Sequence, residues 1–155
     1  MPAAENQTRT GVLGLAAWLL NLASRFPDAI LVIMARFCIA AIFWRSGETK
    51  VDGWHLNDTA VQLFQEEYKV PLVPPELAAT MSAIAEHIFP VMLVIGFGAR
   101  FGACGLLFMT LVIEVFVYPD AWPIHGVWAV ALLLIITRGP GMVSIDHWVR
   151  RRFLG

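Results

Sequence analysis

Hydrophobic residues in this chain form long continuous runs, separated by short segments rich in proline, glycine and charge. Runs of this kind predict membrane-spanning helices, because about 20 apolar residues cross the hydrocarbon core of a bilayer. We predict four spans, at residues 28–46, 77–98, 101–118 and 124–138. The fourth is roughly 22 Å long against a core of about 30 Å, so we expect it to begin earlier, within residues 120–123, or the bilayer to thin there.

The only long predicted loop joins the first two spans and covers residues 47–76. Asn57, Asp58 and Thr59 are typical helix-capping residues, and they predict a short helix that continues to Tyr68. Its partly amphipathic pattern favours a lid on the membrane surface. Prolines in residues 70–75 predict an extended return to the second span.

Residues 10–26 are apolar but short for a span. A helix lying in the membrane interface is one interpretation, because several polar residues fall near one helical face: Gln7, Thr10, Gly14, Asn21 and Arg25. A secretory signal peptide is the other, since Arg9 precedes the apolar run.

The predicted fold class is an all-α membrane protein. It is a four-transmembrane-helix bundle with an N-terminal interfacial helix and a short helix in the first external loop. The expected domains are a tail and interfacial helix at 1–27, the membrane domain at 28–148, and a basic cytoplasmic tail at 149–155.

Composition supports the membrane class. The chain is 58% hydrophobic and 15% charged, whereas a soluble domain carries about 25% charged residues. The net charge of −1 gives no basis for nucleic-acid binding. Cys38 and Cys104 lie far apart in apolar stretches and are interpreted as small packing residues.

The distribution of lysine and arginine predicts the orientation. One side of the predicted bundle carries seven of these residues, namely Arg9, Arg25, Arg100, Arg138, Arg150, Arg151 and Arg152. The other side carries three, namely Arg45, Lys50 and Lys69. Both termini are therefore expected in the cytoplasm.

Two opposite charges lie inside predicted spans, Arg36 in the first and Glu86 in the second. A lone charge at bilayer depth is costly and usually has a partner. The two residues lie roughly 12 Å and 18 Å from the cytoplasmic ends of their spans, a gap that a long arginine could bridge. We predict an Arg36–Glu86 pair, with His87 nearby on another helical face, either as a proton or substrate site or as an ion pair that fixes helix register.

A second polar layer is predicted near the outer surface, made of Arg45, Glu48, Lys50, Glu114 and His125. It is interpreted as a cavity mouth or as solvated helix ends. Glu114 lies within an apolar run and needs a partner, for which Lys50 and His125 are the nearest candidates. The histidines lack metal-ligand spacing, although His55 and His125 could meet in a copper site.

Four stretches, in order, resemble the DoxX family of small four-helix membrane proteins. The first runs from Arg36 to Lys50, the second has Val70-Pro71 and Pro74, the third has Glu86, Gly96 and Arg100, and the last runs from Trp128 to Asp146. The pattern positions carried over are Arg36, Gly47, Lys50, Glu86, Gly96, Arg100, Gly139, Gly141, Ser144 and Asp146. Pro140 cannot extend the fourth span, and Asp146 could cap a helix or pair with Arg100 or Arg150.

The resemblance implies a bacterial inner-membrane protein that accompanies redox systems, including quinone reduction and thiol oxidation. The leading hypothesis is an accessory subunit of a redox or stress-response system with an intramembrane polar site for a quinone or another small polar ligand. Whether it is itself an enzyme stays open. The alternatives are a non-enzymatic membrane scaffold or lipid-binding protein, and a transporter or copper-handling accessory. The expected partners are membrane lipids, a soluble or membrane redox protein, and a second copy in a homodimer.

Overall fold

The computed structural model describes residues 13–22 and 26–153. The chain divides into two units, one up to Ile30 and one from Leu31 onward. In the first unit, Leu13–Leu22 is a short apolar helix whose side chains are all exposed. Three of the polar residues that carried the interfacial interpretation, Gln7, Thr10 and Arg25, lie outside the described residues.

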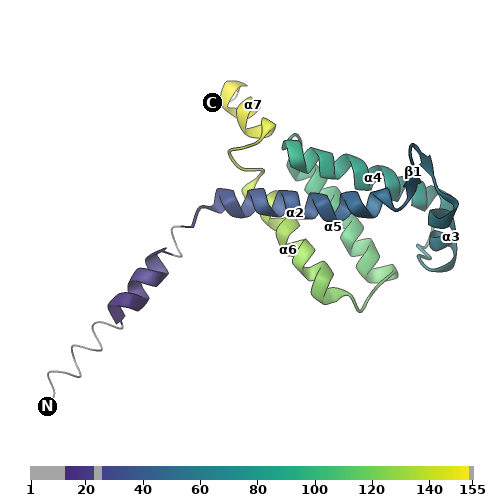
Figure 1. Ribbon diagram of the computed structural model, residues 1–155, viewed down its shortest axis with the longest axis horizontal. Helices are drawn as coiled ribbons and strands as arrows, with labels where there is room; N and C mark the ends of the chain where they lie inside the picture. Colours follow the sequence, from purple (N-terminus) through teal and green to yellow (C-terminus); the bar gives the residue numbers. More distant parts are fainter. Residues whose placement is uncertain (1–12, 23–25, 154–155) are drawn as a thin grey trace, which may run out of the picture. The chain divides into compact units, whose positions relative to one another are not determined.

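Six labelled helices and one two-stranded hairpin follow in the described chain (Figure 1). The helices are α2 (Asp28–Glu48), α3 (Asp58–Glu66), α4 (Pro75–Ile95), α5 (Ala99–Phe116), α6 (Trp122–Arg138) and α7 (Ile145–Phe153). The strands are β1 (Val51–Asp52) and β2 (His55–Leu56), which pair antiparallel. The predicted spans correspond to α2, α4, α5 and α6, and α6 begins at Trp122, within the predicted segment.

Three helices, α2, α4 and α5, are long and apolar enough to cross a membrane. The fourth, α6, is apolar but has 17 residues, which corresponds to about 26 Å. Large apolar side chains are exposed along all four helices, as expected of a bundle whose outer surface meets lipid rather than water.

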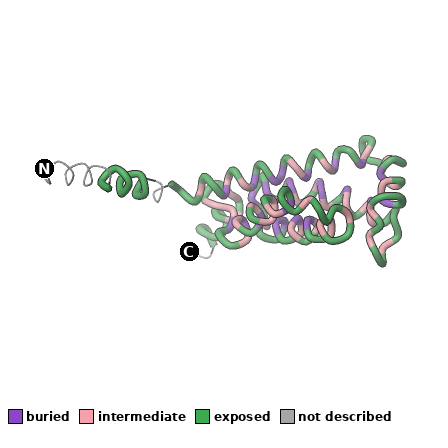
Figure 2. The backbone as a smooth tube through the Cα atoms, turned by 90° about the horizontal axis from the view of Figure 1, so that it is seen from below, coloured by how far each residue is buried: buried purple, intermediate pink, exposed green. Residues whose placement is uncertain are grey.

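The core lies where these four helices face one another. It is formed by Ile39, Ala40 and Phe43 of α2, Leu93 of α4, Ala103 and Leu106 of α5, and Leu132 and Ile135 of α6. Figure 2 shows the buried positions on the inward sides of the helices and the exposed positions outside. The link between α4 and α5 is tight because Gly96 and Gly98 both adopt left-handed backbone angles, which glycine reaches without strain.

The long loop contains the predicted short helix, α3. The Asn57 side chain caps it by accepting a hydrogen bond from the Ala60 backbone N–H at 2.7 Å. The predicted extended return is instead a turn at residues 71–73, with Leu72 at a φ of 71°. Pro71 fixes its own φ at a value typical of the second turn position, which favours this reversal.

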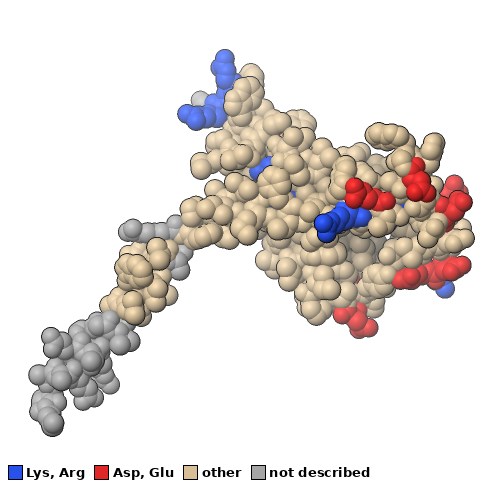
Figure 3. Space-filling view, in the orientation of Figure 1, with Lys and Arg blue, Asp and Glu red and all other residues tan. Residues whose placement is uncertain are grey.

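The charges divide between the two ends of the bundle. Figure 3 shows basic side chains gathered on α7, and acidic side chains over α3 and the hairpin. The hairpin end is defined by Val51–Leu56. The arginine end is defined by Arg100, Arg138 and Arg150, which lie near the start of α5, the end of α6 and within α7.

Candidate functional site

Glu86 is buried beside Lys50, near the hairpin end. Lys50 Nζ lies 2.7 Å from Glu86 Oε2, and the side chains are 6% and 3% exposed. Ser46 Oγ and Ser82 Oγ donate to Glu86 Oε1 at 3.3 and 3.2 Å. Lys50 also donates to the Ser46 carbonyl and hydroxyl oxygens at 3.2 and 3.0 Å. The four side chains form a closed network, which we call the lysine–glutamate cluster.

The predicted Arg36–Glu86 pair is wrong. Glu86 lies level with Gly47, because a Cβ added at Gly47 would lie 3.1 Å from Glu86 Cβ. Arg36 precedes Gly47 by 11 residues, or roughly 16 Å along α2, which exceeds the reach of an arginine side chain. Lys50 follows the end of α2 and turns back to the depth of Glu86.

Arg36 instead binds four backbone carbonyls toward the arginine end. Its guanidinium donates to Leu93 O at 2.7 Å and Val94 O at 2.8 Å, both in the last turn of α4. It also donates to Pro140 O at 2.6 Å and Val143 O at 2.7 Å in the loop after α6. The last carbonyls of a helix lack intrahelical donors and carry negative partial charge, so they neutralise a buried guanidinium. Arg36 therefore ties α2 to the end of α4 and to the loop before α7.

His87 lies beside the lysine–glutamate cluster without joining it. Its Nδ1 is 2.7 Å from the Ala83 carbonyl oxygen, and its ring stands edge-on to Trp44 at 4.9 Å between centroids. A Cβ at Gly47 would come within 2.8 Å of the His87 ring, so glycine is required at Gly47 for this close approach.

Glu114 has the partner that one of the two predicted alternatives named. His125 Nδ1 lies 2.5 Å from Glu114 Oε2, and both side chains are largely buried. The His125 ring also packs on Trp128, which stands edge-on to Phe43 in the core. This second polar pair bridges α5 and α6, whereas Lys50, the other candidate, is committed to Glu86.

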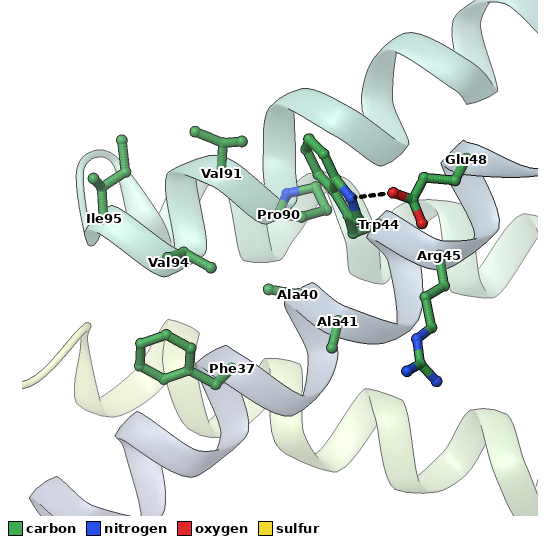
Figure 4. A pocket seen from close by; sticks show the side chains of 10 residues that line it. All are labelled: Phe37, Ala40, Ala41, Trp44, Arg45, Glu48, Pro90, Val91, Val94 and Ile95. Atoms are coloured by element: carbon green, nitrogen blue, oxygen red, sulfur yellow. Dashed lines mark hydrogen bonds between the residues drawn. The ribbon is translucent and has the colours of Figure 1, made fainter. Parts of the chain in front are cut away.

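The remaining members of the predicted outer layer, Arg45 and Glu48, line a groove of about 390 Å³ between α2 and α4 (Figure 4). Glu48 Oε1 accepts a hydrogen bond from the Trp44 indole N–H at 2.9 Å. The rest of the lining is apolar: Phe37, Ala40, Ala41, Pro90, Val91, Val94 and Ile95. The small residues Ala40, Ala41 and Pro90 leave the volume that larger side chains would fill.

The family-pattern residues near the arginine end hold the loops together. Asp146 caps α5, since its two carboxylate oxygens accept from Gly98 N at 2.8 Å and Ala99 N at 3.1 Å. This confirms capping, one of the two roles predicted for Asp146. Gly96 packs so closely on Ser144 that an added Cβ would lie 2.5 Å from Ser144 Cβ.

Ser46, Ser82 and Trp44 are site residues that sequence reasoning missed. Each serine lies one helical turn before the charged residue it contacts, Ser46 before Lys50 and Ser82 before Glu86. A polar residue four positions before a buried charge was the available signal, because such pairs share a helix face.

Tyr118, between α5 and α6, reaches the α3 region. Its hydroxyl donates to Glu67 and contacts the Tyr68 hydroxyl. The hydrogen bond to the Glu67 carboxylate, followed by that to Tyr68, raises the pKa of Tyr118 above its ordinary value. This contact fastens the end of the α3 lid to the α5–α6 loop.

Among residues 13–22 and 26–153, no group of three or more His, Cys, Asp or Glu side chains is placed to hold a metal ion. Cys38 and Cys104 are unpaired and exposed on the outside of the bundle. The interpretation of these cysteines as small packing residues is therefore wrong within the bundle.

The fold and the site define a helical membrane protein whose interior charges are satisfied within the bundle, by ion pairs or by backbone carbonyls. Residues 31–119 match the DoxX family, and the chain belongs to that family. It is also similar to a protein of Haemophilus influenzae described as uncharacterized, at 25% identity over 134 residues, which cover 80% of this chain and 86% of the relative. No solved structure matches the chain.

Proposed function

We propose that this protein is an inner-membrane accessory subunit of a redox or stress-response system, and that it binds a quinone in the groove between α2 and α4. The groove carries this proposal because it joins a long apolar wall to one polar mouth, formed by Arg45, Glu48 and the Trp44 indole. A flat polar head on an apolar tail matches that distribution, since ligand sites are mostly apolar with a few placed polar groups.

The buried polar pairs are better suited to holding the helices together than to contacting a ligand. In the described chain, every buried side-chain nitrogen and oxygen has a hydrogen-bond partner, so a ligand entering the lysine–glutamate cluster would have to displace existing bonds. His87, the neighbour of Glu86 in the sequence, contacts Trp44 at the groove. The Lys50–Glu86 ion pair joins the chain after α2 to α4, and α2 and α4 are the two helices that form the groove.

We propose a four-span arrangement with both termini in the cytoplasm and Leu13–Leu22 in the interface. The apolar α6 supports a fourth span, since its deficit of a few ångströms can be met by local bilayer thinning or by snorkelling of flanking residues. The concentration of arginine at one end supports the orientation.

The groove is tested by filling it. Val91→Phe places a larger side chain in the groove, whereas Val130→Phe makes the same change on an exposed part of α6 that does not line it. We expect the affinity of the purified protein for a short-tailed ubiquinone, measured by calorimetry in detergent, to fall about tenfold or more in the first variant only.

If Val91→Phe and Val130→Phe bind ubiquinone with equal affinity, the quinone does not bind in this groove. An unaltered protein that binds no quinone would favour the second candidate, a scaffold without a redox ligand. The closed lysine–glutamate cluster favours that candidate, because it fastens the long loop to α4 and exposes no reactive group.

A further inference from the structure

A second hollow lies at the arginine end, away from the α2–α4 groove. Its volume is about 320 Å³, and basic side chains from three helices line it: Arg100 of α5, Arg138 of α6, and His147 and Arg150 of α7. The turn of Gly139, Pro140 and Gly141 and the side chains of Met142 and Asp146 complete the wall. We call it the arginine pocket.

The turn in this pocket is fixed before any ligand arrives. Arg36 binds the Pro140 and Val143 carbonyl oxygens, and Gly139 and Gly141 both have a φ of 81°. The Arg100 guanidinium lies against Gly139, since an added Cβ would be 3.1 Å from Arg100 Nη2. A side chain at Gly139 would therefore displace the arginine, so the small turn residues set the position of Arg100.

The single carboxylate among the lining residues is already engaged. Both oxygens of Asp146 accept backbone N–H groups at the start of α5, so this carboxylate is held at that helix terminus. The guanidinium groups of Arg100 and Arg150 on the same hollow then favour an anion. Guanidinium is the side chain best matched to the oxygens of a phosphate.

The face of α7 turned away from the pocket is apolar and exposed. Ile145, Trp148 and Val149 lie opposite the face that bears His147 and Arg150, and Trp148 is 63% exposed. A short helix with an apolar face and a basic face typically lies in the headgroup region of a bilayer. With the apolar face in the bilayer, the opposite, basic face lies at the level of the lipid phosphates.

We propose that the arginine pocket is a binding site for the phosphate headgroup of an anionic phospholipid, held by Arg100 and Arg150 in the headgroup layer where α7 lies. The site is independent of the quinone groove, because none of its lining residues contributes to the groove.

The test compares Arg100→Gln and Arg150→Gln with Arg151→Gln, which removes the same charge from α7 but does not line the pocket. The purified proteins are titrated with phosphatidylglycerol, phosphatidylcholine and inorganic phosphate, and bound lipid is counted by native mass spectrometry. We expect affinity for phosphatidylglycerol to fall about fivefold in each pocket variant and to stay near the unaltered value in Arg151→Gln.

An equal loss of phosphatidylglycerol affinity in all three variants would show that only general surface charge matters, and it would contradict a binding site in the pocket. Equal affinity for phosphatidylcholine would remove the selectivity for anionic lipid, and equally tight binding of inorganic phosphate would exclude the lipid as the specific ligand. Circular dichroism melting without lipid separates a loss of binding from a folding defect. Arg150 is exposed on α7, so Arg150→Gln is not expected to disturb folding. The Val91→Phe groove variant should keep full affinity for phosphatidylglycerol, which distinguishes this site from the proposed quinone site.

Discussion

At the residue scale, the buried charges of this protein differ in the groups that bind them. Arg36 is surrounded by carbonyl oxygens, whereas Lys50 and Glu86 depend mainly on each other. The consequence of removing a partner should therefore be largest in the lysine–glutamate cluster, because a charge left alone in a low-dielectric interior keeps its full desolvation cost.

We expect Lys50→Met to destabilise the fold by about 3 kcal/mol or more, because Glu86 would then be buried with only two serine hydroxyls as partners. The double variant Lys50→Met/Glu86→Leu should recover most of that loss, since it leaves no unpaired charge. Reversible unfolding in mixed detergent micelles measures both. Lys69→Met, on an exposed side chain, is the matched control and should stay within about 0.5 kcal/mol of the unaltered protein. Equal effects of Lys50→Met and Lys69→Met would show that the ion pair contributes nothing to stability.

At the element scale, close packing between α4 and α5 depends on small residues of α5. Phe89 of α4 lies directly against Gly105, where an added Cβ would overlap the ring, and Gly102 faces Leu93. These glycines allow the two helices to approach within the bundle, as small residues do in membrane proteins. Both glycines pack against α4 of the same chain, so they give no support to the predicted homodimer.

Gly105→Ala should therefore destabilise the bundle by about 1–3 kcal/mol through overpacking against Phe89. Gly126→Ala on α6 is the matched control, because the nearest atom to its added Cβ is 3.8 Å away. That change should stabilise the protein by up to about 1 kcal/mol through helix propensity. The same unfolding assay separates the two, and a neutral Gly105→Ala would mean that the Phe89 ring moves aside freely.

At the scale of the whole molecule, charge and helix length decide how the bundle sits in a bilayer. Acidic side chains lie over α3 and the hairpin, and basic side chains lie on α7 (Figure 3). With α4, α5 and α6 all spanning, residues in the hairpin and in the loop after α6 lie on opposite sides of the membrane. With α6 failing to span, they would lie on the same side.

We expect single cysteines at these two places to be labelled from opposite faces. In a background with Cys38→Ser and Cys104→Ser, W54C should react with a membrane-impermeant maleimide in right-side-out vesicles, and M142C only in inverted vesicles. Trp54 and Met142 are 99% and 69% exposed, so both sites are accessible to the reagent. Labelling of both variants from one side would contradict the fourth span, and the reverse pattern would place the termini outside.

The sequence by itself determined the helices, because each apolar run and each proline or glycine boundary acts locally on the backbone. It predicted the α6 start within residues 120–123, the Asn57 cap and the family of the chain, and it named every charged member of the two buried ion pairs. Those inferences rest on chemistry visible within one stretch of chain.

Only the tertiary structure decided which charges meet. Depth along a helix is known from sequence, but the relative sliding of two helices depends on packing between them, and here Glu86 lies level with Gly47 rather than with Arg36. The chain after α2 also turns back, which brings Lys50 to Glu86 and leaves Arg36 to the carbonyls of α4 and the loop after α6. The groove and the arginine pocket arise in the same way, because each combines residues from helices that are distant in sequence.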